Sequence, residues 1–144
     1  MRKALASFAV LLLCTDLSAQ ELTSFRSVDI FIDSGNQPLA AYQLTFRSTN
    51  GSIKIVGIEG GEHSAFAEPP YYDPEAMQKD HVIIAAFNTS PATQLPSGRT
   101  RVATIHLQTD VNPAPSYKLE VSAAATSDGK RISVKAHLQE RTAR

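Results

Sequence analysis

Apolar side chains recur at every second position through most of this chain. Between residues 28 and 32, Val28, Ile30 and Ile32 alternate with Asp29 and Phe31. A strand directs successive side chains to opposite faces, so this period of two lets one face be buried while the other meets water. A helix would need apolar residues three or four positions apart. The alternation therefore predicts β-strands.

The same period continues along the chain, and polar or glycine-containing turns separate the segments. The later strand-like segments are 40–47, 53–58, 82–87, 101–108, 119–123 and 132–138. Asn50-Gly51 and Asp128-Gly129 tolerate the positive φ of tight turns, and we expect segments 119–123 and 132–138 to form a hairpin. Seven short strands without intervening helices predict an all-β chain folded as an antiparallel two-sheet sandwich.

The inward faces of these strands also predict the core. We expect one sandwich core, made by a set of apolar side chains or their immediate strand neighbours. The set is Ile30, Tyr42, Leu44, Phe46, Ile55, Ile84, Phe87, Val121 and Val134. Segment 82–87 is apolar at every position, which favours an interior strand.

The least regular stretch is residues 62–80, for which we expect a short irregular or helical loop. Pro69, Pro70 and Pro74 lack the N–H that a sheet ladder needs. We predict one helical turn over residues 74–78. Long loops on rigid scaffolds often carry function.

Three aromatic residues and one carboxylate in this loop are the candidate ligand-binding or partner-binding residues: Phe66, Tyr71, Tyr72 and Asp73. Aromatic rings bury much area at low entropic cost, which suits a protein interface or stacking on a sugar. The alternative is that the rings fold back and close one end of the sandwich. The sequence contains no tryptophan, which weakens the sugar interpretation.

The first residues resemble an export signal. Arg2 and Lys3 precede an apolar run that ends at Cys14, and Ala19 offers a small residue for cleavage. The run is too short for a membrane anchor, and the leucines before Cys14 disfavour a lipoprotein signal. We therefore expect a signal peptide over residues 1–19 and a secreted or periplasmic protein. Cys14 is the only cysteine, so the mature chain would contain no disulfide.

The net charge and the length of the chain limit its possible ligands and its number of domains. The chain has 14 basic and 14 acidic residues, and removing Arg2, Lys3 and Asp16 with the signal leaves 12 and 13, a net charge of −1. This balance argues against nucleic-acid binding, which needs a basic surplus. We expect a single domain over residues 20–138, followed by a polar tail over residues 139–144.

The order of these segments resembles the cohesin-like family of β-sandwich modules. The resemblance covers residues 27–138 and is carried by the segments 41–58, 82–87 and 98–107. It implies a jelly-roll sandwich, the fold that cohesins share with several carbohydrate-binding modules. It also implies a secreted bacterial protein that binds another protein.

Residue types offer little support for catalysis. No serine lies in a Gly-x-Ser-x-Gly turn, and the histidines His63, His81, His106 and His137 occur singly, without metal-ligand spacing. His106 and His137 are expected as outward-facing polar residues. The acidic residues of the loop follow no calcium-loop motif, although calcium binding there stays open.

We therefore predict no enzyme, no cofactor and no metal site. The expected function is a non-catalytic secreted module that binds an exported protein, and the alternative is a carbohydrate-binding module that binds a polysaccharide. Neither a nucleic acid nor a membrane anchor is expected.

Overall fold

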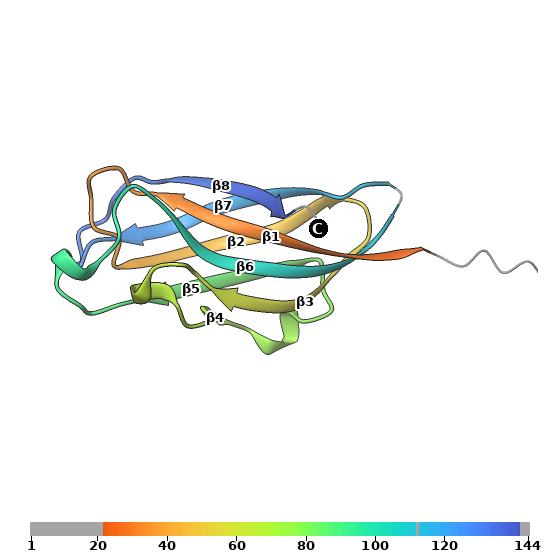
Figure 1. Ribbon diagram of the computed structural model, residues 1–144, viewed down its shortest axis with the longest axis horizontal. Helices are drawn as coiled ribbons and strands as arrows, with labels where there is room; N and C mark the ends of the chain where they lie inside the picture. Colours follow the sequence, from red (N-terminus) through yellow and green to blue (C-terminus); the bar gives the residue numbers. More distant parts are fainter. Residues whose placement is uncertain (1–21, 112, 142–144) are drawn as a thin grey trace, which may run out of the picture.

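The seven alternating segments and one two-residue strand in the loop over residues 62–80 give eight strands, which run along the long axis of the molecule (Figure 1). The computed structural model describes residues 22–111 and 113–141. Its strands are β1 (Thr23–Asp33), β2 (Ala41–Asn50), β3 (Ile53–Gly60), β4 (Tyr71–Tyr72), β5 (His81–Phe87), β6 (Arg99–Asp110), β7 (Ser116–Ala125) and β8 (Lys135–Arg141). The expected signal peptide and its cleavage position lie outside the described residues.

The strands make two antiparallel four-stranded sheets. One sheet has the order β3-β6-β1-β8 and the other has the order β4-β5-β2-β7. Three 3-10 turns are the only helical elements in the described chain: η1 (Ser64–Phe66), η2 (Pro74–Ala76) and η3 (Ala92–Gln94). The prediction of an all-β sandwich with an irregular loop near residues 62–80 is confirmed. In the described part of the chain, no helix is long and apolar enough to cross a membrane.

Except for β4 and β5, consecutive strands lie in opposite sheets. The predicted hairpin between segments 119–123 and 132–138 is therefore wrong beyond its turn, because β7 pairs with β2 while β8 pairs with β1. Gly51 and Gly129 do adopt positive φ, at 73° and 79°. Each of these turns nevertheless carries the chain across the sandwich. The alternation of apolar residues specifies which face of a strand is buried. That face is the same whether the next strand forms a hairpin or crosses to the other sheet, so the pattern does not distinguish the two.

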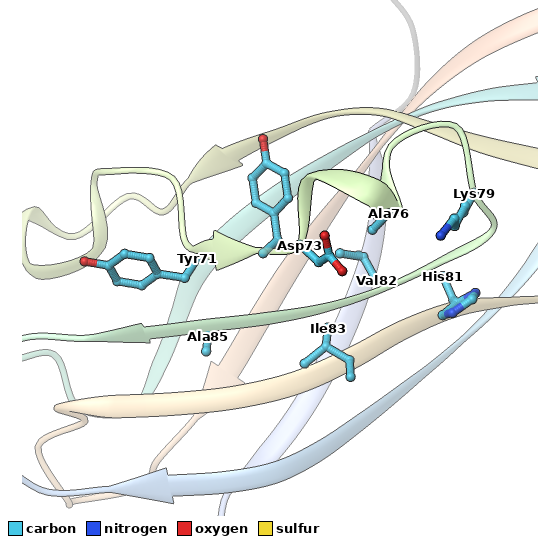
Figure 2. Close-up of a pocket in the computed structure, with 9 residues that line it drawn as sticks. Tyr71, Asp73, Ala76, Lys79, His81, Val82, Ile83 and Ala85 are labelled. Carbon is cyan, nitrogen blue, oxygen red and sulfur yellow. The ribbon is translucent and has the colours of Figure 1, made fainter.

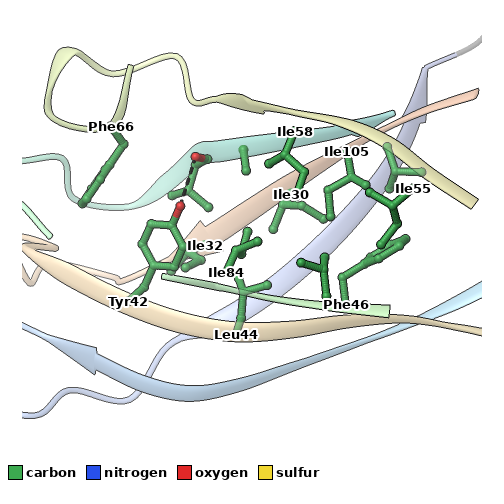
Figure 3. Packing of buried hydrophobic residues seen from close by; sticks show 14 of the residues in the cluster. Ile30, Ile32, Tyr42, Leu44, Phe46, Ile55, Ile58, Phe66, Ile84 and Ile105 are labelled. Atoms are coloured by element: carbon green, nitrogen blue, oxygen red, sulfur yellow. Dashed lines mark hydrogen bonds between the residues drawn. The ribbon is translucent and has the colours of Figure 1, made fainter. Parts of the chain in front are cut away.

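The core lies between the two sheets (Figure 3). Of the predicted core residues, six are buried: Ile30, Tyr42, Leu44, Phe46, Ile55 and Ile84. Val121 and Val134 are partly buried and pack against them. Phe87 is an exception, since 63% of it is exposed and its strand neighbour Ala86 faces the core instead.

The strand β8 continues through Arg141, beyond the predicted domain end at residue 138. Arg141 is held there by the carboxylate of Asp29 in β1, which its Nε contacts at 2.9 Å. Residues 139–141, the first part of the expected polar tail, thus form the exposed end of β8. Residues 142–144 lie outside the described chain.

Two adjacent glycines let the loop after β3 pack closely on the sheet. A Cβ at Gly60 would overlap the carbonyl oxygen of Ala67, and a Cβ at Gly61 would overlap that of Arg101. The N–H of Gly61 donates to the carbonyl oxygen of Phe66 at 2.6 Å. These contacts bring η1 against the end of the sandwich.

Candidate binding surface

The loop predicted to carry the site divides its aromatic residues between the core and the surface. Phe66, in η1, is only 3% exposed and packs edge-on against Tyr42, with ring centroids 5.4 Å apart. Figure 3 shows both rings projecting into the space between the sheets. Phe66 therefore closes one end of the sandwich, as the alternative interpretation expected, and is not on the surface.

Tyr42, beneath Phe66, is a buried phenol with a defined partner. Its hydroxyl donates to the carbonyl oxygen of Val102 at 3.2 Å, so the polar end of the ring is satisfied inside the core. Burial raises the pKa of Tyr42 well above its ordinary value. This group stays neutral and serves the packing of the loop.

Tyr71 and Tyr72 point to different surroundings because they are neighbours on a strand. Tyr72 is half-buried and packs against the core, whereas Tyr71 is 70% exposed. The two residues pair with Ile84 and Ala85 of β5, which places β4 at the edge of its sheet. Of the predicted aromatic residues, Tyr71 alone presents most of its side chain to solvent.

The exposed ring of Tyr71 lies beside a second exposed ring, that of Phe87. Their centroids are 6.0 Å apart and the ring planes differ by 12°. Ile83, on the same outward face of β5, is 54% exposed, and Ala85 lies between it and Phe87 in sequence. We call these four residues, Tyr71, Ile83, Ala85 and Phe87, the β4–β5 patch.

Ile83 and Phe87 were not identified as site residues from the sequence. The available signal was the unbroken apolar run over residues 82–87. In a strand, such a run makes both faces apolar. Val82 and Ile84 fill the core, and the outward set has no cover in the described structure. An apolar outward face on a sheet is the kind of feature that marks an interaction site.

Beside the patch lies an open pocket of about 420 Å³ between η2 and β5 (Figure 2). Residues from β4, η2, β5 and the segments that connect them line it: Tyr71, Tyr72, Asp73, Ala76, Lys79, His81, Val82, Ile83 and Ala85. Because β4 pairs with β5 at only two positions, the edge of β5 at residues 81–83 faces this pocket rather than another strand. The pocket thus combines apolar walls with a charged rim.

Asp73, which lines the pocket, and Asp80, next to the pocket residue His81 in sequence, both have local partners. Asp73 caps η2, since its Oδ1 accepts from the N–H of Glu75 at 2.9 Å. Asp80 lies 2.9 Å from Nδ1 of His81, and the hydrogen bond from His81 lowers the pKa of the Asp80 carboxyl. Asp73 therefore has a structural role at the pocket margin, and its carboxylate remains exposed enough to meet a ligand.

The residues described contain no group of three or more His, Cys, Asp or Glu side chains placed to hold a metal ion. Calcium binding was considered because of the acidic residues of the loop, and these residues are spread along it. One of them, Glu62, accepts a hydrogen bond from the backbone N–H of Arg101 at 2.9 Å.

His106 lies on the outward face of the other sheet, between a serine and a glutamate. Its Nδ1 is 2.9 Å from Oγ of Ser27, and its Nε2 is 3.1 Å from Oε1 of Glu59, without hydrogen-bond alignment. These are the residue types of a nucleophilic triad. However, Ser27 lies in a strand that pairs with β6 on one side and with β8 on the other. The backbone N–H groups near Ser27 therefore form hydrogen bonds within the sheet and cannot stabilise an oxyanion, as a nucleophilic triad requires. We assign this contact to cross-strand pairing.

Comparisons of the chain with protein-family models, with curated proteins and with solved structures give no match. The arguments about function therefore rest on the surface itself.

Proposed function

We propose that this chain is a non-catalytic, exported binding module of the cohesin-like type, and that it binds another protein through the β4–β5 patch. The observation that carries the proposal is the cluster of three large exposed apolar side chains, Tyr71, Ile83 and Phe87, on the outward face of one sheet. Interface centres are enriched in aromatic residues and depleted in charge, with polar residues at the rim.

The chemistry of the patch favours a partner with an apolar surface of its own. Ile83 and Phe87 offer no hydrogen bond, so a ligand gains there only by removing apolar area from water. Lys79 and His81 at the neighbouring pocket supply polar groups at the rim. A protein surface satisfies both requirements at once.

A carbohydrate-binding module is the second candidate, favoured by one specific observation. The rings of Tyr71 and Phe87 are nearly parallel and both are exposed. Paired aromatic faces of this kind can stack on sugar rings. Ile83, by contrast, has no aromatic face to offer a sugar.

Three substitutions separate the candidates. Tyr71→Ala and Phe87→Ala should weaken binding of either ligand class by about 2 kcal/mol or more, as expected for the centre of an interface. Ile83→Asn should weaken retention of a protein partner and leave retention on insoluble polysaccharide unchanged. Val56→Ala, an exposed apolar side chain on the other sheet, is the matched control.

The measurements are retention on insoluble polysaccharides and cross-linking to proteins of the secreted fraction, each with a thermal melt of the same variant. Tyr72→Ala should lower the melting temperature, since Tyr72 packs on the core, while Tyr71→Ala should not. If Tyr71→Ala and Phe87→Ala bind both ligand classes as the unsubstituted protein does, the patch is not the binding surface.

A further inference from the structure

The strand β7 ends its sheet, and part of its outer edge is open. In the described residues, β7 pairs with β2 on one side only. Near its end, the other side is covered, because the N–H of Ile132 donates to the carbonyl oxygen of Ala124 at 3.0 Å and Arg131 donates to that of Ser122 at 3.2 Å. The open edge is therefore residues 116–121.

The direction of the backbone groups along this edge follows from β2. At the two ends of β2, the carbonyl oxygen of Ala40 accepts from Asn88, and the N–H of Ser48 donates to Asp80, both on the β5 side. Successive residues of a strand direct their backbone groups to alternate sides. The even-numbered residues of β2 thus bond toward β5, and the odd-numbered residues bond toward β7.

The register then assigns the backbone groups of β7. Lys118 and Glu120 lie opposite Arg47 and Thr45, so they are hydrogen-bonded to β2. Leu119, between them, lies opposite Phe46 and directs its N–H and C=O away from the sheet. The same holds for Tyr117 and Val121, two positions on either side.

The side chains along the edge divide in the same way. Those of Tyr117, Leu119 and Val121 face inward and are only partly buried at the margin of the core. Lys118 and Glu120 lie on the outward face, where Nζ and Oε1 are 2.8 Å apart and about half of each side chain is exposed. Within residues 22–111 and 113–141, the edge thus offers unpaired backbone groups, an incomplete apolar margin and two opposite charges two residues apart.

We propose that a second copy of this chain pairs antiparallel with this edge, with Leu119 opposite the partner's Leu119. This register has a twofold axis at residue 119. It places Lys118 opposite the partner's Glu120, and Glu120 opposite the partner's Lys118. On the inner face, Tyr117 lies opposite the partner's Val121.

This register both satisfies the free backbone groups and places opposite charges next to each other. The free backbone groups of Leu119 meet those of the partner's Leu119, and those of Tyr117 and Val121 meet those of the partner's Val121 and Tyr117, which gives about six backbone hydrogen bonds. Lys118 and Glu120 then form the closer, non-hydrogen-bonded pairs, where opposite charges attract most and like charges repel most. The edge is therefore complementary to itself, which is the requirement for a symmetric dimer.

Such a dimer would join two four-stranded sheets into one continuous sheet. The two β4–β5 patches would lie on the same outward face, with their β5 strands separated by about 24 Å at the usual strand spacing. A partner with two matching sites would then be bound bivalently. The dimer itself does not depend on the function proposed for the patch.

Charge reversal tests the register directly. We expect the purified full chain to sediment as a dimer that dissociates on dilution. Lys118→Glu and Glu120→Lys should each raise the dimer dissociation constant about 10- to 100-fold, because each turns both cross-strand pairs into like charges. Mixing the two variants in equal amounts should restore association, since each chain then meets opposite charges on the other. The double variant carrying both reversals should dimerise by itself.

Controls keep the result interpretable. Lys118 and Glu120 are exposed, so thermal melts and circular dichroism should show that both variants remain folded. Lys54→Glu, an exposed residue on the edge strand β3 of the other sheet, should leave the dimer unchanged. A chain that stays monomeric at millimolar concentration would overturn the proposal. The proposal would also be overturned if Lys118→Glu and Glu120→Lys left the dimer dissociation constant unchanged, or if Lys54→Glu disrupted the dimer.

Discussion

Asp29 in β1 and Arg141 at the end of β8 form a two-point contact on the outward face of their sheet. Nε of Arg141 donates to Oδ2 of Asp29 at 2.9 Å, and Nη2 of Arg141 lies 2.9 Å from Oδ1. Thr104 in β6 adds a third contact, since its hydroxyl donates to Oδ1 at 2.6 Å. One carboxylate therefore joins three adjacent strands, including the last strand of the described chain.

Removing the guanidinium should loosen the last strand. Arg141→Ala should lower the free energy of unfolding by about 1.5 to 3 kcal/mol, the usual range for hydrogen bonds to a charged group. Asp29, with only 12% of its side chain exposed, would lose its counter-charge. Urea denaturation measures the change, and Lys135→Ala, exposed on the same strand, should alter stability little. An equal effect of both substitutions would contradict a specific role for the Asp29–Arg141 contact.

Asp29 should also make the protein sensitive to acid. Burial alone would raise the pKa of Asp29, but the hydrogen bonds from Arg141 and Thr104 outweigh burial and lower the pKa below its ordinary value. A carboxyl whose folded-state pKa is lowered contributes stability that is present above its unfolded pKa of 3.8 and is lost as pH falls through the folded value.

The measurement is the free energy of unfolding of the unsubstituted protein and of Asp29→Asn at neutral pH and at about pH 3. Asp29→Asn should be less stable at neutral pH, and the difference between the two proteins should shrink on acidification. A difference that stays constant with pH would show that Asp29 does not titrate as the contact requires.

Truncation of two phenylalanines should lower stability to different extents. Phe46→Ala removes a fully buried ring and should cost about 3 to 5 kcal/mol of stability. Phe87→Ala removes an exposed ring whose main contact in the patch is Tyr71, and should cost less than about 1.5 kcal/mol. Chemical denaturation of the two variants checks this contrast. Similar losses would mean that Phe87 is more enclosed than its exposure indicates.

The glycines of β3 provide a second contrast. Gly60→Ala would force Cβ into the backbone of residues 67 and 68, so η1 and Phe66 would have to move, and we expect a loss of about 1 to 3 kcal/mol or more. Gly57→Ala on the same strand meets only ordinary contacts with the His106 side chain, the nearest at 3.5 Å. Thermal melts should show a clear drop for Gly60→Ala alone.

Part of the candidate surface was visible in the sequence. The loop over residues 62–80 drew attention because prolines and aromatic residues interrupt a regular strand pattern, and Tyr71 and Asp73 do lie at the pocket. Phe66 belongs to the core, since the approach of Gly60 and Gly61 carries η1 over the end of the sandwich. Phe87 was assigned to the wrong face. In a run that is apolar at every position, the sequence does not indicate which alternate residues face the core.

By itself, the sequence determined every strand except the two-residue β4, most of the buried faces and most of the turn positions. These properties depend on neighbouring residues, as with Val28, Ile30 and Ile32 on one side of β1. The tertiary structure decided which strands pair, which turns cross the sandwich and which distant side chains meet, such as Tyr71 with Phe87 and Asp29 with Arg141. The physical reason is that backbone N–H and C=O groups are the same in nearly every residue, so a local pattern can specify burial without specifying a partner.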